Sequence, residues 1–394
     1  MKREVKRLLN KKLTRREFIK KSLVGLAGAG IAFYTLDSLV KNKVFGKFSY
    51  EKGPEKLWKW SKEAYHYTKL GENVQCNICP NRCILGEGER SFCRVKTNKG
   101  GKLYTLVYGN PCAVHVDPIE KKPLFHFLPG TKAFSIATAG CNFRCLNCQN
   151  WQISQSKPEE TRNYELFPKD VVKGAKQYGC ESIAYTYSEP VAFYEYMYDT
   201  AKEAKHEGLR NLWITNGYIN REALLDLSQY LDAANVDIKN FKEEIYNTLN
   251  GGHLKPVLET VKTLKERKVW FELTNLVIPN YTDDMEMIEE MCKWIVKNLG
   301  PSYPLHFSRF YPMYKLKLLP PTPVDTLERA AKIAEDCGME YVYIGNVPGH
   351  VKESTFCPDC KRILIERKGY KILQNNIQNG ACKFCGKEIA GVWS

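Results

Sequence analysis

The sequence has no internal repeat, no low-complexity stretch and no apolar run of about 20 residues, which is the length that a membrane-spanning helix needs. The first two absences exclude a repeat architecture and argue against a disordered chain. The longest apolar run, residues 23–36, is too short for a comfortable span. The 394 residues, 43% of them hydrophobic and 12% aromatic, can bury a large core. The length predicts one large domain with small appendages.

The net charge of +15 is unevenly distributed. Residues 1–21 contain ten Lys or Arg and only two Glu, so this leader alone carries +8. The remaining +7 falls further if cysteines bind metal, since a four-thiolate zinc site carries about −2 and a three-thiolate cubane about −1. A nearly neutral body argues against a nucleic-acid partner.

The leader, residues 1–48, pairs Arg15 and Arg16 in the segment TRREFIKK and then runs through the apolar residues 23–36. This order resembles a twin-arginine export signal. No small-x-small cleavage site follows, so the leader is predicted to stay attached as an anchor. We therefore expect a membrane-associated protein or one exported through the twin-arginine pathway. The alternative is an ordinary basic end on a cytoplasmic protein.

Short β-rich runs alternate with helical periodicity across residues 131–349. This alternation predicts parallel strands joined by right-handed helical crossovers. The expected fold class is α/β, a partial (β/α)6 barrel or an open parallel sheet, with the chemistry at the carboxyl ends of the strands. The predicted strands are 133–138, 181–187, 211–215, 233–238, 269–277 and 305–310, and predicted helices include 191–206, 222–231, 256–267 and 285–296.

Fifteen cysteines are many for this length, and eleven of them fall into short-spaced groups. Such clustering indicates metal sites before disulfides. The other four are predicted to be small buried hydrophobes. These are Cys112, Cys180, Cys292 and Cys337.

The first core strand is followed directly by Cys141, Cys145 and Cys148 in a Cys-x3-Cys-x2-Cys loop. Three thiolates on one tight loop can each ligate one iron of a [4Fe-4S] cluster, and without a fourth nearby cysteine one iron stays open. An open iron can chelate the amino and carboxylate groups of S-adenosylmethionine (SAM). Zinc is the alternative, but it requires four ligands.

The loop and the Gln149-Asn150-Trp151 that follows resemble the radical SAM superfamily, and residues at later strand ends resemble pyruvate formate-lyase activating enzymes. Asn147 departs from the pattern, which usually has an aromatic residue there against the adenine; Phe143 or Trp151 could replace it. The resemblance implies a set of SAM contacts at successive strand ends. They are Ser188, Glu189, Asn216, Asp237, Lys239 and His306.

Two further cysteine groups flank the core. In the C-terminal segment, residues 350–394, two Cys-x2-Cys knuckles predict a structural zinc ribbon, with disulfides or rubredoxin-like iron as alternatives. In the N-terminal module, residues 55–130, a less regular group predicts zinc or a second cluster over two disulfides. The ribbon ligands are Cys357, Cys360, Cys382 and Cys385, and the N-terminal ligands are Cys76, Cys79, Cys83 and Cys93.

Residues 117–127, with both cysteine modules and the final Gly-Val-Trp, resemble the radical SAM member of the AmmeMemoRadiSam group over about residues 55–394. The resemblance implies Memo-like and AMMECR1-like companion proteins. The acid, bases and His126 of this segment either line the barrel mouth as proton donors or substrate contacts, or form a salt-bridged surface turn.

The function expected from these patterns is reductive cleavage of SAM to methionine and a 5′-deoxyadenosyl radical, which abstracts hydrogen from a protein or small-molecule substrate. The electron would come from a donor such as ferredoxin or flavodoxin. The activase resemblance adds a glycyl-radical activase as one subtype, beside a modifier of a small molecule or peptide. The rival function is a non-catalytic iron–sulfur or zinc protein for electron transfer or interaction. A pure electron carrier has no use for the strand-end residues.

Overall fold

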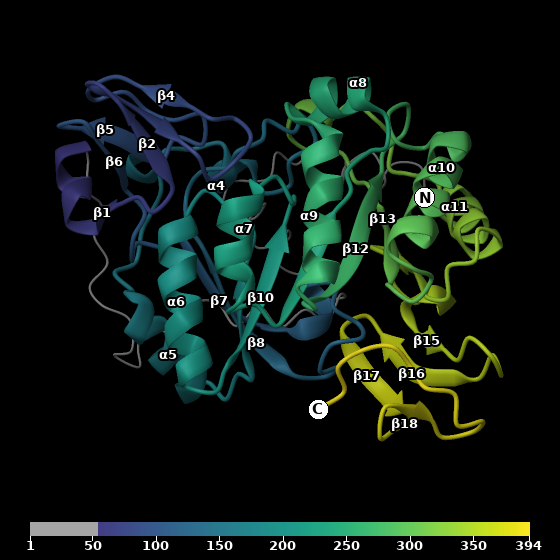
Figure 1. The fold of residues 1–394 in the computed structure, drawn as a ribbon. Helices are drawn as coiled ribbons and strands as arrows, with labels where there is room; N and C mark the ends of the chain where they lie inside the picture. The colour runs from purple at the N-terminus through teal and green to yellow at the C-terminus, as the bar shows by residue number, and fades with distance from the viewer. Residues whose placement is uncertain (1–53) are drawn as a thin grey trace, which may run out of the picture. The chain divides into compact units, whose positions relative to one another are not determined.

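The structure is a computed structural model and describes residues 54–394 (Figure 1). The predicted leader, residues 1–48, lies outside the described residues. No described helix is long and apolar enough to cross a membrane.

The core is an eight-stranded sheet in which neighbouring strands follow chain order, β14-β13-β12-β11-β10-β9-β8-β7. Strands β8 to β14 are parallel, and β7 pairs with β8 in the antiparallel direction. The prediction of an α/β fold built on a parallel sheet is confirmed. The strands are β7 (Ala113–Pro118), β8 (Lys132–Ala137), β9 (Ser182–Tyr185), β10 (Arg210–Thr215), β11 (Ala233–Asp237), β12 (Trp270–Val277), β13 (Leu305–Arg309) and β14 (Val342–Gly345).

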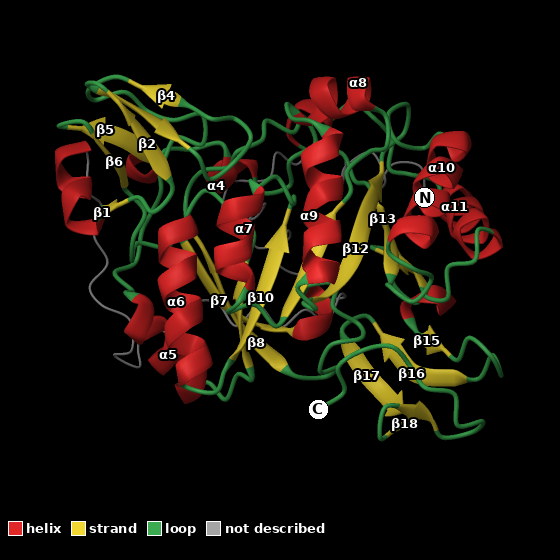
Figure 2. Cartoon of the chain, viewed as in Figure 1, coloured by secondary structure: helices red, strands yellow, loops and turns green. Residues whose placement is uncertain are grey.

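A long helix connects each parallel strand to the next, and Figure 2 shows α6, α7 and α9 lying in front of the strands. Their amphipathic spacing explains this layer, because α9 buries Val257, Val261 and Leu264 at helical intervals against the sheet side. The connecting helices are α5 (Pro168–Gln177), α6 (Tyr194–His206), α7 (Arg221–Ser228), α9 (Leu254–Glu266), α10 (Met285–Asn298) and α11 (Val324–Asp336).

The other face of the sheet is covered near the strand starts by residues 119–128. Ile119, Leu124 and Phe127 are buried there against Ala133 and Leu212. Removing apolar surface from water stabilises the fold by about 25 cal/mol per Å², so these buried side chains make the segment part of the core. Residues 117–127 are therefore not a surface turn, and this expectation of the sequence is corrected.

Two small β units lie at opposite edges of the sheet (Figure 2). The N-terminal strands lie at the edge toward which β10 and β12 point, whereas β15 to β18 lie at the other edge. The N-terminal unit has sheets β1-β6-β5 and β2-β3-β4, and the C-terminal unit has β15-β16-β17 and β18-β19. Their strands are β1 (Lys62–Glu63), β2 (Tyr67–Leu70), β3 (Asn73–Cys76), β4 (Ile84–Leu85), β5 (Lys96–Lys99), β6 (Lys102–Thr105), β15 (Thr355–Phe356), β16 (Ile363–Lys368), β17 (Lys371–Asn375), β18 (Ile377–Gln378) and β19 (Ala381–Cys382).

Short helical turns complete the described chain. Two of them border the loop that follows β8: α4, and a π-helical turn, η4, after β11. The short elements are η1 (Pro54–Trp60), η2 (Ile119–Lys121), α4 (Trp151–Ser154), η3 (Pro158–Glu160), α8 (Glu243–Ile245), η4 (Tyr246–Asn250), η5 (Tyr314–Leu316) and η6 (Val351–Glu353).

Candidate functional site

The loop after β8 carries the three predicted cluster cysteines as free thiols at the carboxyl edge of the sheet. It begins at Gly140, whose φ of +95° lies in the left-handed region. A Cβ at this position would approach the carbonyl oxygen of Cys93 to 2.5 Å, so only glycine lets the loop leave the strand here.

Main-chain hydrogen bonds fix the loop against the π-helical turn. The amide of Arg144 donates to the carbonyl of Asn250 at 2.8 Å, and the amide of Leu146 donates to Leu249 at 2.9 Å. Phe143 is fully buried, and its ring centroid lies 4.8 Å from that of Tyr218. The loop geometry is therefore set by packing before any cofactor binds.

Each of the three sulfur atoms has a polar neighbour. Phe143 donates its amide to Cys141 Sγ at 3.3 Å, Asn250 donates Nδ2 to Cys145 Sγ at 3.3 Å, and Cys148 Sγ lies 3.0 Å from the hydroxyl of Ser154. Burial raises the pKa of the Cys141 and Cys145 thiols. Thiolates on this loop therefore need a metal to offset the cost of burial.

A buried hydrogen-bond network joins the loop to the ends of β9 and β10. Glu189 accepts from the Thr215 hydroxyl at 2.7 Å and from the Asn216 amide at 2.8 Å. Asn216 then donates its side-chain amide to Asn142 Oδ1 at 2.8 Å. Burial raises the pKa of Glu189 to about 7, although these donors work in the opposite direction. The network holds a carboxyl group beside the first cysteine.

Asp237 and Lys239 bring a cation to the same edge, at the end of β11. Lys239 Nζ lies 2.7 Å from Asp237 Oδ2. Burial opposes the lysine's charge, but Asp237 and the Cys145 thiol raise the pKa of Lys239 above its usual value. The structure thus gathers five of the six predicted SAM residues around the cysteine loop. These are Ser188, Glu189, Asn216, Asp237 and Lys239.

The sixth residue, His306, is not among them. It is the second residue of β13, near the strand start, and its Nε2 lies 2.7 Å from Glu272 Oε2. Its ring packs 4.8 Å from Phe125 and 4.9 Å from Tyr343, measured between ring centroids. His306 belongs to a buried cluster at the opposite level of the sheet.

His126 lies in the same buried cluster. Its Nδ1 lies 2.6 Å from the Ala390 carbonyl and its Nε2 lies 2.6 Å from the Tyr343 hydroxyl. Arg367 donates to the Phe125 carbonyl at 2.8 Å and to the Thr355 hydroxyl at 2.7 Å. These contacts tie the C-terminal unit to the core, so His126 has a structural position away from the cysteine loop.

Sequence reasoning missed the role of Tyr187, which precedes Ser188 directly. Its φ of +62° is a strained conformation for a bulky residue and costs about 1–3 kcal/mol. Its carbonyl accepts from Asn150 Nδ2 at 2.7 Å, and its hydroxyl bonds Asp117. Only the positive φ, which the sequence does not reveal, directs this ring toward the buried acid.

Asp117 and Lys122 form a buried ion pair beneath that ring, with 2.6 Å between Nζ and Oδ2. Burial lowers the pKa of Lys122 to about 8, although Asp117 raises it. Burial opposes the ionisation of Asp117, but the two neighbouring lysines and Tyr187 hold its pKa below its usual range. The acid and base of residues 117–127 therefore do come together inside the fold.

The two aromatic candidates for the adenine contact differ in exposure. Phe143 is part of the core. Trp151 is 37% exposed and stacks on Tyr314 with 5.3 Å between centroids and 14° between ring planes. Trp151 follows the third cysteine by three residues, so an aromatic face borders the loop from that side.

A cubane cluster on three thiolates fits these residues. A single metal ion would need at least three ligand atoms close to one another. Within residues 54–394, the three cysteines of this loop do not belong to any group of three or more ligand atoms that all lie within 4.8 Å of one another. Three buried polar atoms beside the loop have no hydrogen-bond partner in the described part of the chain. They are Asn147 Oδ1, Ser188 Oγ and Asn250 Oδ1.

The C-terminal cysteines form a different kind of site. Their four sulfur atoms all lie within 4.8 Å of one another, with 3.6 Å from Cys357 to Cys385 and 3.7 Å from Cys360 to Cys382. A tetrahedral zinc with Zn–S bonds of about 2.3 Å separates its ligands by about 3.8 Å. The group could therefore hold one metal ion, and its cysteines are free thiols.

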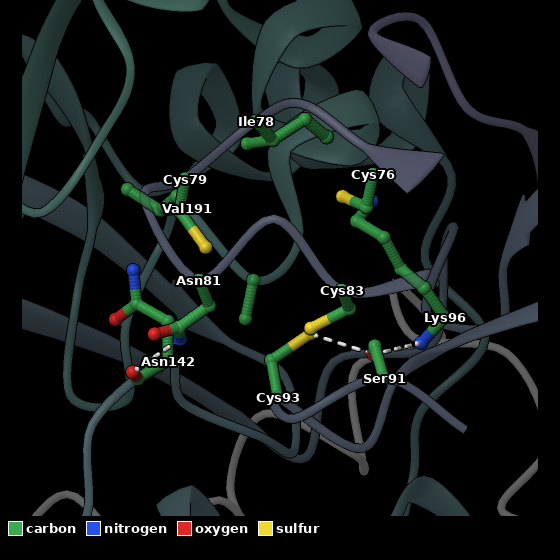
Figure 3. Close-up of a pocket in the computed structure, with 11 residues that line it drawn as sticks. Cys76, Ile78, Cys79, Asn81, Cys83, Ser91, Cys93, Lys96, Asn142 and Val191 are labelled. Carbon is green, nitrogen blue, oxygen red and sulfur yellow. Dashed lines mark hydrogen bonds between the residues drawn. The ribbon is translucent and has the colours of Figure 1, made fainter. Parts of the chain in front are cut away.

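The N-terminal cysteines line one small cavity with Ser91, Lys96 and Asn142 (Figure 3). They too are free thiols. Asn142 belongs to the loop after β8, so this cavity lies directly beside the candidate cluster site. The four are Cys76, Cys79, Cys83 and Cys93.

Residues 135–295 match the model of the radical SAM superfamily. The chain is 48% identical over 331 residues to the uncharacterized protein MJ0808 of Methanocaldococcus jannaschii, covering 83% of this chain and 98% of that protein. It is 25% identical over 219 residues to the pyruvate formate-lyase 1-activating enzyme of Escherichia coli K12, covering 52% of this chain and 89% of that enzyme.

The chain belongs to the radical SAM superfamily. The superfamily implies a [4Fe-4S] cluster and SAM, which agrees with the three-cysteine loop. Among solved structures, Streptococcus suis SuiB bound to S-adenosylmethionine matches with a TM-score of 0.45 and 14% identity, over 61% of this chain and 56% of SuiB. As a radical SAM protein, this chain is related to glycyl-radical activating enzymes.

Proposed function

We propose that this radical SAM protein is an enzyme that cleaves SAM and abstracts hydrogen from a substrate. One observation carries the proposal: the three-cysteine loop shares the carboxyl edge of the sheet with a buried carboxyl group, Glu189, and a partly exposed ion pair, Asp237–Lys239. When bound, a [4Fe-4S] cluster with SAM on its open iron supplies reductive cleavage of SAM to methionine and a 5′-deoxyadenosyl radical.

The side chains at the edge have complementary parts in this proposal. Cys141, Cys145 and Cys148 hold the cluster, and Asn250 orients the second thiolate through its 3.3 Å hydrogen bond. Lys239 offers an ammonium group to the carboxylate of SAM. Glu189 offers negative charge to the amino group of SAM. A pure electron carrier would need neither group.

The polar network fixes these groups before SAM arrives. Both carboxylate oxygens of Glu189 are already held, one by the Thr215 hydroxyl and the other by the Asn216 amide. The neighbouring Ser188 hydroxyl has no partner in the described chain and is available to SAM. Preorganised groups cost little reorganisation when a charged ligand binds.

Substrate would enter from the inner face of the sheet. Trp151 and Tyr314 offer a stacked aromatic surface beside the loop, which suits the adenine. Deeper in the fold, Tyr187 links the loop's Asn150 to the Asp117–Lys122 pair. In this proposal the Tyr187 hydroxyl and the lysine contact the substrate, because Tyr187 directly precedes Ser188 and bonds the Asp117 that pairs with Lys122.

The substrate is a protein glycine in the activase subtype or a small molecule or peptide in the other. The relatives that are activating enzymes support the first subtype. A ferredoxin- or flavodoxin-type protein would supply the electron. The Memo-like and AMMECR1-like companions stay a prediction. The division at residues 131–349 for the core and 350–394 for a structural zinc ribbon is part of the same proposal.

The test uses the full chain, reconstituted anaerobically with iron and sulfide, then given dithionite and SAM. We expect release of 5′-deoxyadenosine even without substrate, because the radical is quenched by solvent or protein. Cys145→Ala should abolish the release, since loss of one of three ligands collapses the cluster. The matched control is Cys180→Ala, which removes a buried thiol from the turn between α5 and β9. Release by Cys145→Ala at the wild-type rate would overturn the proposal.

A further inference from the structure

The four N-terminal cysteines come from separate parts of one small unit and face one cavity (Figure 3). Cys76 ends β3, Cys79 and Cys83 lie in the turn to β4, and Cys93 lies just before β5. Two sulfur atoms have polar neighbours: the Phe92 amide donates to Cys83 Sγ at 3.3 Å, and the Ser91 hydroxyl lies 3.1 Å from Cys93 Sγ. Hydrogen bonds of this kind stabilise the charge of metal-bound thiolates.

These cysteines are spread more widely than the ribbon cysteines. In the described part of the chain, only the ribbon group brings three or more ligand atoms within 4.8 Å of one another. A zinc ion would draw four sulfur atoms to separations of about 3.8 Å. A cubane places each thiolate on a different iron atom, so its ligands stand farther apart. The N-terminal frame therefore fits a cluster better than a single ion.

A buried ion pair borders the same cavity. Lys96, which is 1% exposed, lines it, and its Nζ lies 2.5 Å from Glu195 Oε2. The ammonium group of Lys96 favours thiolates on the wall of this cavity, and the Glu195 carboxylate offsets part of its charge.

The cavity and the loop after β8 share a wall. Asn81 donates Nδ2 to the carbonyl of Asn142, the residue after Cys141, at 3.0 Å. Arg144 donates to the Cys141 carbonyl at 3.1 Å and also to the Phe92 carbonyl. The Cys93 carbonyl packs against Gly140 so closely that a Cβ there would lie 2.5 Å away. The N-terminal cysteine unit and the loop after β8 are therefore in direct contact.

We propose that Cys76, Cys79, Cys83 and Cys93 hold a second [4Fe-4S] cluster, which passes single electrons to the cluster on the loop after β8. The proposal rests on the proposed function for that loop. A reduced ferredoxin- or flavodoxin-type donor gives one electron to the second cluster and is itself oxidised by one electron. The second cluster would return to its oxidised state when this electron moves to the cluster on the loop after β8. SAM cleavage there would consume the electron.

The first test counts metal in the reconstituted full chain. Wild type should hold about eight iron atoms, four for each cubane, and one zinc. The double variant Cys83→Ala, Cys93→Ala should lose about four iron atoms and keep the zinc. The double variant Cys145→Ala, Cys148→Ala should also lose about four. About four iron atoms and two zinc ions in wild type would overturn the second cluster without touching the proposed function.

The second test separates an electron relay from a structural cluster. With a flavodoxin-type donor, the Cys83→Ala, Cys93→Ala variant should release 5′-deoxyadenosine more than about tenfold more slowly than wild type. With dithionite, which reaches clusters directly, its rate should stay within about twofold. An unchanged electron paramagnetic resonance (EPR) response to SAM shows that this variant is folded. Equal rates with the flavodoxin-type donor would overturn the relay, and no release from wild type with either reductant would overturn the proposed function instead.

Discussion

The C-terminal cysteine group and the loop after β8 both offer cysteine sulfur atoms as ligands, but they arrange them differently. The four ribbon sulfur atoms enclose a space of one ion, with 3.6 Å and 3.7 Å between opposite partners. The three loop sulfur atoms are each held by a different neighbour and border polar atoms that have no partner in the described chain. A closed ligand set leaves no coordination position for chemistry, whereas an open set does. The difference supports the proposal of a structural role for the first site and a catalytic role for the second.

The largest expected effect comes from breaking the closed site. Cys382→Ser should lose one zinc per chain and unfold residues 350–394, because the small buried cluster around Leu364 and Ile365 cannot order them alone. Structural zinc supplies about 10 kcal/mol or more of folding free energy in small domains. Zinc analysis and limited proteolysis check this result. Cys337→Ser, at the end of α11, is the matched control and should keep its zinc. Unchanged zinc in Cys382→Ser would remove the ribbon assignment.

A smaller effect is expected at the open site. Glu189→Gln keeps the size of the side chain but replaces one acceptor oxygen with a donor, so it cannot accept from both Thr215 and the Asn216 amide. Charge-assisted hydrogen bonds contribute about 1.5–3 kcal/mol, which corresponds to a loss of roughly tenfold or more in SAM affinity. Equilibrium dialysis with the reconstituted protein measures it. Glu203→Gln, at a partly exposed position of α6, should bind SAM as wild type does. Equal affinities would show that Glu189 has no part in binding.

The junction between the ribbon and the core should respond to acid. Burial lowers the pKa of His126 from 6.5 to about 4, despite Glu272 and the Ala390 carbonyl, and Arg367 and His306 add to the lowering. The unfolded chain therefore binds a proton that the folded chain does not, and stability falls as the pH drops from about 6.5 to about 4. Urea unfolding at several pH values should show this slope. His126→Gln should flatten it, and an unchanged slope would contradict the buried neutral imidazole.

The smallest effect on either metal site is expected from the leader. The double variant Arg15→Lys, Arg16→Lys should leave iron and zinc content unchanged, because both sites lie within residues 54–394. It should change membrane association or sidedness, which fractionation with protease accessibility measures. If neither changes, the paired arginines are only a basic face. A soluble cytoplasmic wild-type protein would remove the targeting prediction altogether.

Much of the core was predictable because it rests on local patterns. The six predicted strands correspond to β8 to β13, and four of the connecting helices fall where the periodicity placed them. Other elements of the core were not among the predicted ones, namely β7, β14, α5 and α11. The strands β7 and β14 form the two edges of the sheet, and α11 follows a proline-rich stretch, residues 320–323, that reads as a break.

The sequence predicted the site residues that lie at strand ends. It did not predict the residues whose place depends on their position along a strand or on a contact inside the fold. Glu189, Asn216, Asp237 and Lys239 end their strands or follow them closely, so the parallel sheet brings them to one edge. His306 is the second residue of its strand, so it lies toward the strand start and away from the edge that carries the cysteine loop. The contact of Tyr187 with Asp117 depends on a positive φ that no residue preference predicts.

The most direct test of the open site is the response of the reduced protein's EPR spectrum to SAM. SAM should change the g-values of the signal carried by the loop after β8, because SAM would ligate its open iron. Cys148→Ala should lose that signal and the response with it. A wild-type spectrum that is the same with and without saturating SAM would contradict the account, because it would mean that no iron of the loop is open to SAM.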